Sequence, residues 1–128
     1  MFPYLAVGIG GAIGSCLRYA ITQLFLIHSA AFPCGTLLSN VIAGFLIGFI
    51  LELDRRAQLF SAPANLFLTT GMLGGLSTFS TFSVETIHFF RHGKYSFAAA
   101  NVLLNLSLSF LGVLGGMALA KLLLRQPE

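Results

Sequence analysis

Charged side chains are scarce in this chain: only 9% of its 128 residues are Asp, Glu, Lys or Arg. A soluble domain carries about 25%, whereas here 56% of the residues are hydrophobic and the mean hydropathy is +0.89. This composition excludes a water-soluble globular protein and predicts an integral membrane protein. The seven Lys and Arg residues lie at the ends of apolar segments, as membrane anchors do, and form no patch for nucleic acid.

Cysteine and histidine are equally sparse. The two cysteines, Cys16 and Cys34, make neither a disulfide framework nor a metal-binding spacing. The three histidines, His28, His88 and His92, have no cysteine or carboxylate at ligand spacing, and we expect them at the membrane interface or in loops. Without a Ser/His/Asp set or a phosphate-binding loop, the sequence predicts no enzyme. The N-terminus also lacks a basic region and a cleavage site, so we expect no cleavable signal peptide.

What the chain does have is four long apolar segments, each long enough to cross about 30 Å of hydrocarbon as a helix. They are Tyr4–Ile27, Gly35–Leu53, Asn65–Phe90 and Phe97–Leu124. The connectors are short, so we expect antiparallel neighbours and both termini on one side of the membrane. The sequence therefore predicts an all-α, multi-pass protein with a single four-helix transmembrane domain over residues 1–128.

Each segment carries two glycines four residues apart, which place two small residues on one helix face and let another backbone approach closely. The pairs are Gly10/Gly14, Gly44/Gly48, Gly71/Gly75 and Gly112/Gly116. Four such pairs in four segments predict a tightly packed bundle that continues into an oligomer.

The basic residues give only a weak orientation signal. One side would hold the N-terminus with Arg55, Arg56, Lys121 and Arg125, and the other side Arg91 and Lys94. Because this bias is small, we expect insertion in both orientations and antiparallel pairing of two copies.

The third segment is interrupted by the stretch Gly71–Ser83, GMLGGLSTFSTFS. Three glycines followed by a Ser/Thr/Phe cluster predict a broken helix, which is tolerated at membrane depth only where protein or a wet cavity surrounds it. We expect one half-helix to end near Gly74, exposing carbonyl groups, and the next to start near Thr78, exposing N–H groups. Carbonyls suit a hard cation such as Na⁺ and N–H groups suit an anion, so the break is the predicted ion site.

Polar side chains inside the apolar segments are functional candidates, because placing them in hydrocarbon is costly. Asn40, in the second segment, offers two amide donors to an anion; a hydrogen bond between helices is the structural alternative. Asn101, Asn105 and Ser109 recur every four residues on one face of the fourth segment. That stripe is either a seam between helices or the wall of a pore, and we favour the pore.

Phe79 and Phe82 lie beyond the glycines, interleaved with Ser80 and Thr81. An aromatic ring has a positive edge, so edge-on rings can line an anion route without a fixed charge. Neutral donors would then hold the anion loosely enough to release it. Ordinary packing is the alternative for both rings.

Two charged residues remain within the apolar segments. Arg18 lies near the end of the first segment, and we expect its side chain to extend to the membrane interface. Glu85 follows the Ser/Thr/Phe cluster by one turn and either faces a vestibule or pairs with a basic group.

Three motifs together resemble the small fluoride channels of the Fluc (CrcB) family. They are GGAIGSCLRY at residues 10–19, GTLLSNVIAG at 35–44 and GGLSTFSTFS at 74–83. The resemblance covers all four segments in order and spacing. It implies four-helix subunits that pair antiparallel as dual-topology homodimers with two pores. Such proteins export fluoride passively across the cell membrane of prokaryotes.

The resemblance also implies roles for individual residues. Phe79 and Phe82 would be the pore phenylalanines, and Asn40 the pore asparagine. Gly74 and Ser77 would give backbone carbonyls to a structural Na⁺ at the centre of the dimer. Many relatives have Thr where Ser77 stands, but the backbone carbonyl is the same in both residues.

The same resemblance implies roles for the remaining polar residues near the pore. Ser80 and Thr81 match the hydroxyl groups beside the phenylalanines. The stripe of Asn101, Asn105 and Ser109 corresponds to a tyrosine and serine track in some relatives.

Two other functions compete with this interpretation. A small multidrug-type exporter also has four helices, but proton-coupled transport needs a deeply buried carboxylate, which the first segment lacks. A structural subunit would pair its polar groups inside the bundle and leave no continuous route. For a fluoride channel, the expected partners are fluoride, membrane lipid and a second copy of the chain, with no nucleic acid.

Overall fold

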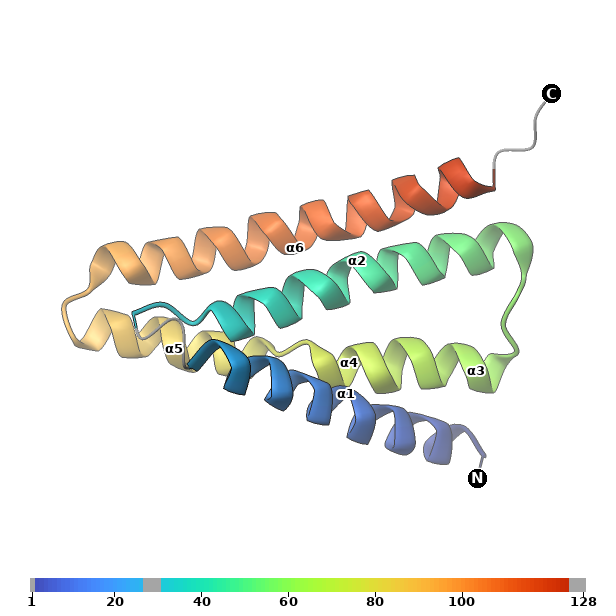
Figure 1. The fold of residues 1–128 in the computed structure, drawn as a ribbon, viewed down its shortest axis with the longest axis horizontal. Coiled ribbons are helices and arrows are strands. Elements are labelled where there is room, and N and C mark those ends of the chain that lie inside the picture. The colour runs from blue at the N-terminus through green and yellow to red at the C-terminus, as the bar shows by residue number, and fades with distance from the viewer. Residues whose placement is uncertain (1, 27–30, 125–128) are drawn as a thin grey trace.

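A computed structural model describes residues 2–26 and 31–124, and all regular structure in these ranges is helical (Figure 1). Three helices are long and apolar enough to cross a membrane: α1 (Phe2–Leu26), α2 (Cys34–Ala57) and α6 (Tyr95–Leu123). The remaining apolar segment is divided into α3 (Ala62–Leu66), the π-helix η1 (Phe67–Leu73), α4 (Gly74–Leu76) and α5 (Phe79–Arg91). The predicted all-α, multi-pass membrane architecture is confirmed.

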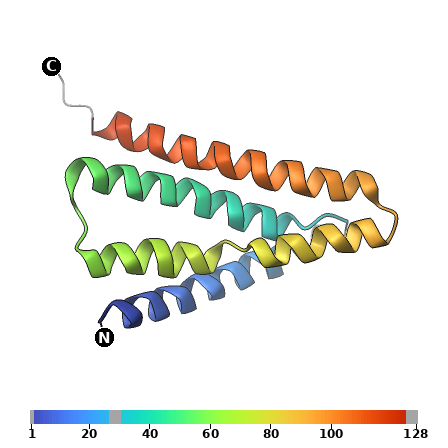
Figure 2. The same cartoon turned by 180° about the vertical axis from the view of Figure 1, so that it is seen from behind.

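The predicted break in the third segment is present, and Figure 2 shows it as a thin connection between two helical ribbons. Ser77 and Thr78 have extended backbones, with ψ angles of 154° and 113°. The second half-helix starts at Thr78, as expected, and the structure shows that Thr78 is its N-cap. The first half-helix continues two residues beyond the expected end at Gly74, to Leu76, because the Ser77 N–H still donates to the Leu73 carbonyl at 3.0 Å.

Two other boundaries differ by three residues or more from those predicted, both at the connection between α2 and α3. The second segment was expected to end at Leu53, but α2 runs four residues further because Glu52 forms ion pairs with Arg55 at 2.7 Å and Arg56 at 2.6 Å. These pairs at i+3 and i+4 support a helix through charged residues. The third segment starts at Ala62, earlier than expected, because Ser61 caps α3.

Asp54 fixes the turn between these helices. One carboxylate oxygen accepts from the Phe60 N–H at 3.0 Å and the other from Asn65 Nδ2 at 2.8 Å. Of the residues placed at segment ends in the sequence analysis, Ile27, His28 and Arg125 lie outside the described residues.

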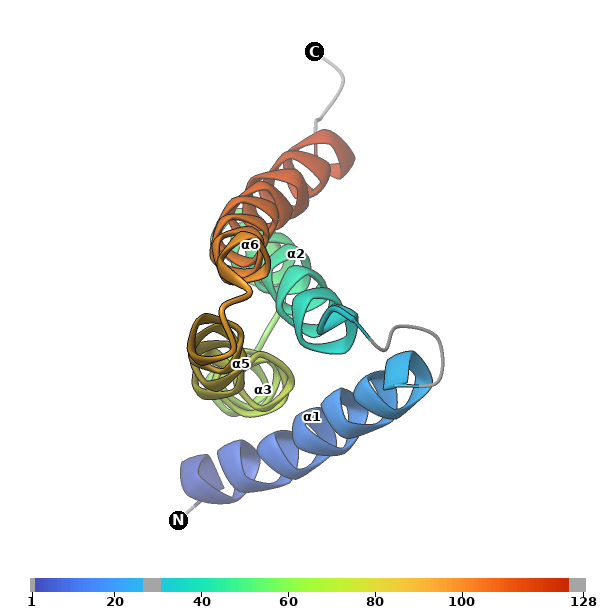
Figure 3. The same cartoon turned by 90° about the vertical axis from the view of Figure 1, so that its left-hand side faces the viewer.

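The four apolar segments alternate in direction, and the described chain begins and ends at the same end of the bundle (Figure 1). The end-on view in Figure 3 shows α2 beside α6, with α5 below α6 and α1 crossing the third segment. The most extensive contacts join α2 to α6, and α1 to the first half of the third segment, chiefly η1. The bundle is therefore built from two closely packed pairs.

The glycine pairs lie at these two contacts, which confirms the prediction of close helix packing. A Cβ atom added at Gly14 would overlap the Met72 carbonyl oxygen, and one added at Gly75 would lie 2.6 Å from the Gly11 carbonyl oxygen. Between α2 and α6, an added Cβ at Gly116 would overlap the Phe45 carbonyl oxygen in the same way. The small buried core beside them consists of Ala43, Leu73 and Leu76.

Candidate functional site

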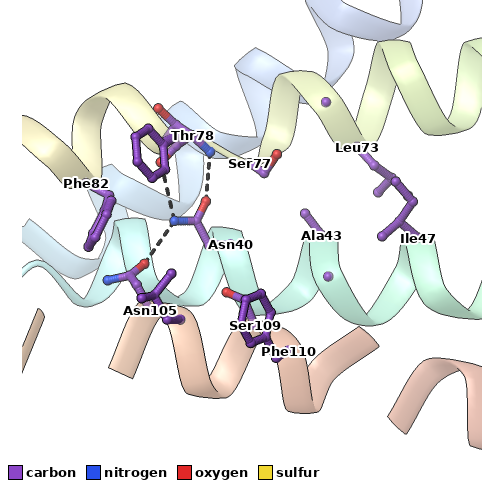
Figure 4. Close-up of a pocket in the computed structure, with 14 residues that line it drawn as sticks. Asn40, Ala43, Ile47, Leu73, Ser77, Thr78, Phe82, Asn105, Ser109 and Phe110 are labelled. Carbon is purple, nitrogen blue, oxygen red and sulfur yellow. Dashed lines mark hydrogen bonds between the residues drawn. The ribbon is translucent and has the colours of Figure 1, made fainter. Parts of the chain in front are cut away.

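A cavity of about 290 Å³ lies beside the break, between the third segment, α2 and α6 (Figure 4). Every residue that lines it is uncharged. The lining residues are Asn40, Ala43, Gly44, Ile47, Leu73, Gly74, Ser77, Thr78, Phe79, Phe82, Asn105, Leu106, Ser109 and Phe110. The structure therefore brings together residues of the second, third and fourth apolar segments that the sequence singled out separately.

Asn40 spans the space between the break and α6. Its Oδ1 accepts a 2.7 Å hydrogen bond from the Thr78 N–H, and its Nδ2 donates to Asn105 Oδ1 at 2.9 Å and to the Thr78 carbonyl at 3.4 Å. Figure 4 shows the amide between these two partners. The interhelical hydrogen bond that was the structural alternative for Asn40 is thus present, and the same side chain also lines the cavity.

The hydrogen bonds continue from Asn105 along one direction. Asn105 Nδ2 donates to the side chain and the carbonyl of Asn101, both at 3.0 Å. Asn101 Nδ2 donates to Thr86 Oγ1 at 2.9 Å, and Thr86 Oγ1 donates to the Phe82 carbonyl, also at 2.9 Å. A single chain of hydrogen bonds therefore links the break to α5 through α2 and α6. Hydrogen bonds in such a chain polarise and strengthen one another.

The asparagine stripe of α6 is divided between two environments. Asn101 is 0% exposed and does not line the cavity, while Asn105 is 4% exposed and borders it. Ser109 lines the cavity further along α6. The side-chain amide groups of Asn101 and Asn105 donate hydrogen bonds within the bundle, as a seam between helices requires. That an anion passes along this stripe stays a prediction.

Phe79 and Phe82 both line the cavity, with ring centroids 5.4 Å apart and ring planes tilted by 56°. Their surroundings differ, because the Phe79 side chain is 75% exposed while Phe82 is 7% exposed. Phe82 is fixed by packing inside the subunit. Phe79, one turn earlier on α5, is held by little of its own chain, so its ring can pack against another molecule.

Thr78 organises the start of α5. Its Oγ1 accepts from the Thr81 N–H at 3.2 Å, which is an ordinary N-cap. The same hydroxyl contacts Thr81 Oγ1 at 2.9 Å and Ser80 Oγ at 3.3 Å. The predicted hydroxyl residues Ser80 and Thr81 thus lie beside the helix start, although neither lines the cavity. The N–H groups of Phe79 and Ser80, in the first turn, have no intrahelical acceptor.

The break diverts the hydrogen-bond partners of the preceding carbonyls. In a continuous helix the Gly74 carbonyl would accept from the Thr78 N–H, but that group donates to Asn40 instead. The Ser77 carbonyl would accept from the Thr81 N–H, which donates to the Thr78 hydroxyl. Gly74 and Ser77 both line the cavity. That their carbonyl oxygens hold a cation stays a prediction.

Arg18 does not extend to the membrane interface, contrary to the expectation from sequence. Its Nε donates to the Gly75 carbonyl at 3.1 Å, at the end of α4. In an unbroken helix that carbonyl would pair with the Phe79 N–H, so a cation replaces the lost donor at the negative end of the half-helix. The side chain turns inward because an unpaired carbonyl in hydrocarbon costs more than the bend of a long side chain.

Glu85 pairs with a hydroxyl group rather than with a basic residue. Thr36 Oγ1 donates to Glu85 Oε1 at 2.6 Å, while Oε2 is buried without a hydrogen-bond partner. Both residues border a small hollow between α1, α2 and α5, away from the cavity at the break. Among the described residues Glu85 has no basic partner, and that it faces a vestibule stays a prediction.

The cavity, the break and the asparagine network can be compared with known proteins. The family model described as "CrcB-like protein, Camphor Resistance (CrcB)" matches residues 5–117. The chain belongs to the CrcB family. A curated relative from Clostridium novyi (strain NT), named "Fluoride-specific ion channel FluC", is 45% identical over 92% of this chain and 93% of its own length.

Further relatives with the same printed name give the same result. One from Clostridium perfringens (strain 13 / Type A) is 46% identical over 93% of this chain and 94% of its own length. Another from Geobacter sulfurreducens is 41% identical over 94% of this chain and 98% of its own length. The similarity to CrcB proteins therefore extends over nearly the whole chain.

Three residues were not predicted from the sequence to belong to the site. They are Thr78 as the N-cap of α5, Thr86 as a member of the hydrogen-bond network, and Arg18 as the hydrogen-bond partner of the Gly75 carbonyl. Thr78 had a readable signal, because a Ser or Thr directly before a helical segment is a typical N-cap. Arg18 and Thr86 had none, since their partners lie 57 and 15 residues away in sequence.

Proposed function

We propose that this protein is a fluoride-selective channel that lets fluoride leave a prokaryotic cell passively through the cell membrane. The observation that carries the proposal is the uncharged cavity at a broken membrane helix, lined by Asn40, Phe79 and Phe82. Membership of the CrcB family supports it, together with relatives of at least 41% identity named as fluoride-specific ion channels.

The chemistry of the cavity suits a small, strongly hydrated anion. The first-turn N–H groups of α5, the Ser109 hydroxyl and the ring edges of Phe79 and Phe82 are neutral donors that can replace water around fluoride. No fixed cation lines the cavity, so the anion is not trapped, and conduction requires release as well as binding. The membrane potential supplies about 2.3 kcal/mol per charge per 100 mV, which drives an anion outward without ATP.

The functional unit in this proposal is an antiparallel homodimer. Phe79 and Phe110 line the cavity and are 75% and 66% exposed, so one wall of the route is open in the single subunit. A second copy in the opposite orientation would complete that wall. The small difference in basic residues between the two ends, with Arg55, Arg56 and Lys121 against Arg91 and Lys94, is compatible with insertion in both directions.

A structural Na⁺ at the centre of the dimer is part of the same proposal. The carbonyl oxygens of Gly74 and Ser77 are hard ligands of the kind that such cations prefer, and their helical N–H partners are diverted to Asn40 and Thr78. The bound ion would supply a positive charge that holds two broken helices against each other. The residues present therefore fit a monovalent cation coordinated by backbone oxygens.

Fluoride efflux from liposomes tests the proposed function. Purified protein is reconstituted into vesicles loaded with potassium fluoride, and external fluoride is followed with an electrode after valinomycin is added. We expect rapid loss of fluoride and retention of chloride, at the same rate with and without a pH gradient. Fluoride retention would refute the channel, and a strict need for a pH gradient would favour a proton-coupled exporter.

A further inference from the structure

Outside the cavity, two histidines lie next to each other at the end of α5. His88 and His92 are four residues apart and share one helix face, with ring centroids 4.2 Å apart and ring planes tilted by 36°. Both are exposed, in the last turn of the helix and at its C-cap. Two imidazoles at i and i+4 on a helix are the spacing with which many proteins hold transition metals.

The hydrogen bond of His92 fixes its tautomer. Its Nδ1 lies 2.8 Å from the His88 carbonyl oxygen, and because a carbonyl can only accept, Nδ1 carries the proton. The lone pair is then on Nε2. A metal-binding histidine usually donates its other ring N–H to a carbonyl or carboxylate in this way, which orients the ring and raises its basicity.

The surroundings give water access to this pair. His88 and His92 both border two open hollows on the surface of the bundle, one shared with Glu85 and Lys94 and the other with Arg91. Within the described residues, no group of three or more His, Cys, Asp or Glu side chains could hold a metal ion. Among the residues that the structure describes, an ion here would have two protein ligands, with water in the remaining positions.

We propose that His88 and His92 form a two-histidine site for a borderline divalent transition metal, such as Cu²⁺, Ni²⁺ or Zn²⁺. Imidazole suits these ions, and their order of affinity should follow Cu²⁺ above Ni²⁺ and Zn²⁺, with no binding of Mg²⁺. The site lies apart from the cavity at the break and does not depend on the proposed channel activity. With two ligands and nearby cationic side chains, binding is weak and exchangeable.

Titration of the tag-free protein with Cu²⁺ and Ni²⁺ tests the site. Calorimetry is done in a buffer that does not itself bind transition metals. We expect His88→Gln and His92→Gln each to weaken metal binding by about tenfold or more. In the wild type, an ion held by one imidazole meets the other at a high effective concentration, and either substitution removes this second ligand. Arg91→Gln should strengthen binding about two- to fivefold by removing a nearby positive charge.

A variant with the same number of histidines separates chelation from the mere presence of imidazole. In the double variant Phe90→His with His92→Gln, the two histidines are two residues apart and lie on different helix faces. The proposal requires this variant to bind as weakly as His92→Gln. It also requires an electron paramagnetic resonance spectrum of the wild-type Cu²⁺ complex with two coordinated nitrogens. Equal binding by the double variant and the wild type, or loss in only one of the two single variants, would overturn it.

Discussion

The backbone N–H of Thr78 donates a 2.7 Å hydrogen bond to Oδ1 of Asn40, which lies 38 residues earlier in the chain. In a continuous helix the same N–H would pair with the Gly74 carbonyl. A side chain of α2 thus takes the place of a backbone group in the third segment. This replacement keeps the helix broken and leaves a backbone oxygen beside the cavity.

The first prediction concerns Asn40 itself. Asn40→Ala leaves the Thr78 N–H and Asn105 Oδ1 without their partner, and a buried unsatisfied polar group costs about 1–3 kcal/mol. We expect a lower midpoint of thermal unfolding in detergent and a large loss of fluoride efflux. Asn40→Asp keeps the acceptor for Thr78 but adds negative charge beside the anion route. Its stability should therefore lie nearer to the wild type while its flux is as low as that of the alanine variant.

Arg18 should stabilise the end of α4. Its hydrogen bond to the Gly75 carbonyl involves a charged donor, for which about 1.5–3 kcal/mol is typical. We expect Arg18→Met, which keeps most of the aliphatic stem, to lower the unfolding midpoint and speed proteolysis near the break. Arg18→Lys should restore part of the stability, because a cation remains near the negative end of the half-helix. Equal stability of all three proteins would show that the contact contributes nothing.

The glycines allow a test with matched controls on the same helices. An added methyl group at Gly14 would overlap the Met72 carbonyl oxygen, whereas at Gly8 it would meet nothing within 4 Å. On α6, Gly116 faces the Phe45 carbonyl oxygen, but an added methyl at the neighbouring Gly115 meets only a ring edge at 3.8 Å.

We therefore expect Gly14→Ala and Gly116→Ala to reduce the yield of folded protein sharply. Gly8→Ala and Gly115→Ala should be neutral or slightly stabilising, since alanine favours helix by about 0.5–1 kcal/mol. Size-exclusion profiles in mild detergent measure the difference. Similar profiles for all four variants would mean that the helices can separate without loss.

Some of these structural features could be predicted from the sequence, and others could not. The four apolar segments, the glycine contacts and the break depend on local composition, and they were predictable. The pairing of α2 with α6, the link from Asn40 to Thr78 and the inward turn of Arg18 depend on contacts between distant residues, which no local pattern encodes. The π-helix η1, which packs against α1, was also missed.

Phe79 and Phe82 should respond differently to the same substitution. Phe82 is buried, so Phe82→Ile removes packing within the subunit and should lower both stability and fluoride efflux. Phe79 is 75% exposed, so Phe79→Ile should leave the stability of the subunit almost unchanged while efflux falls at least about tenfold. Efflux and unfolding midpoints measured on the same preparations separate the two effects. Normal efflux by Phe79→Ile would make that ring a packing group alone.

The final prediction concerns Na⁺. If the carbonyl oxygens of Gly74 and Ser77 from two copies hold this ion, replacing Na⁺ by the large cation N-methyl-D-glucamine should weaken the dimer. Light scattering in detergent, across a range of protein concentrations, would then show more monomer, and fluoride efflux should fall in parallel. Returning Na⁺ should restore both, because an ion that binds only the assembled state stabilises that state by mass action.

Side-chain substitution at Ser77 distinguishes a carbonyl ligand from a hydroxyl ligand. Ser77→Ala and Ser77→Thr both keep the backbone carbonyl, so each variant should show the same Na⁺ dependence as the wild type. Loss of that dependence in Ser77→Ala alone would assign the ligand to the hydroxyl group. A dimer that is indifferent to every monovalent cation would remove the cation from the centre of the assembly, and the carbonyl groups at the break would then need water or protein donors instead.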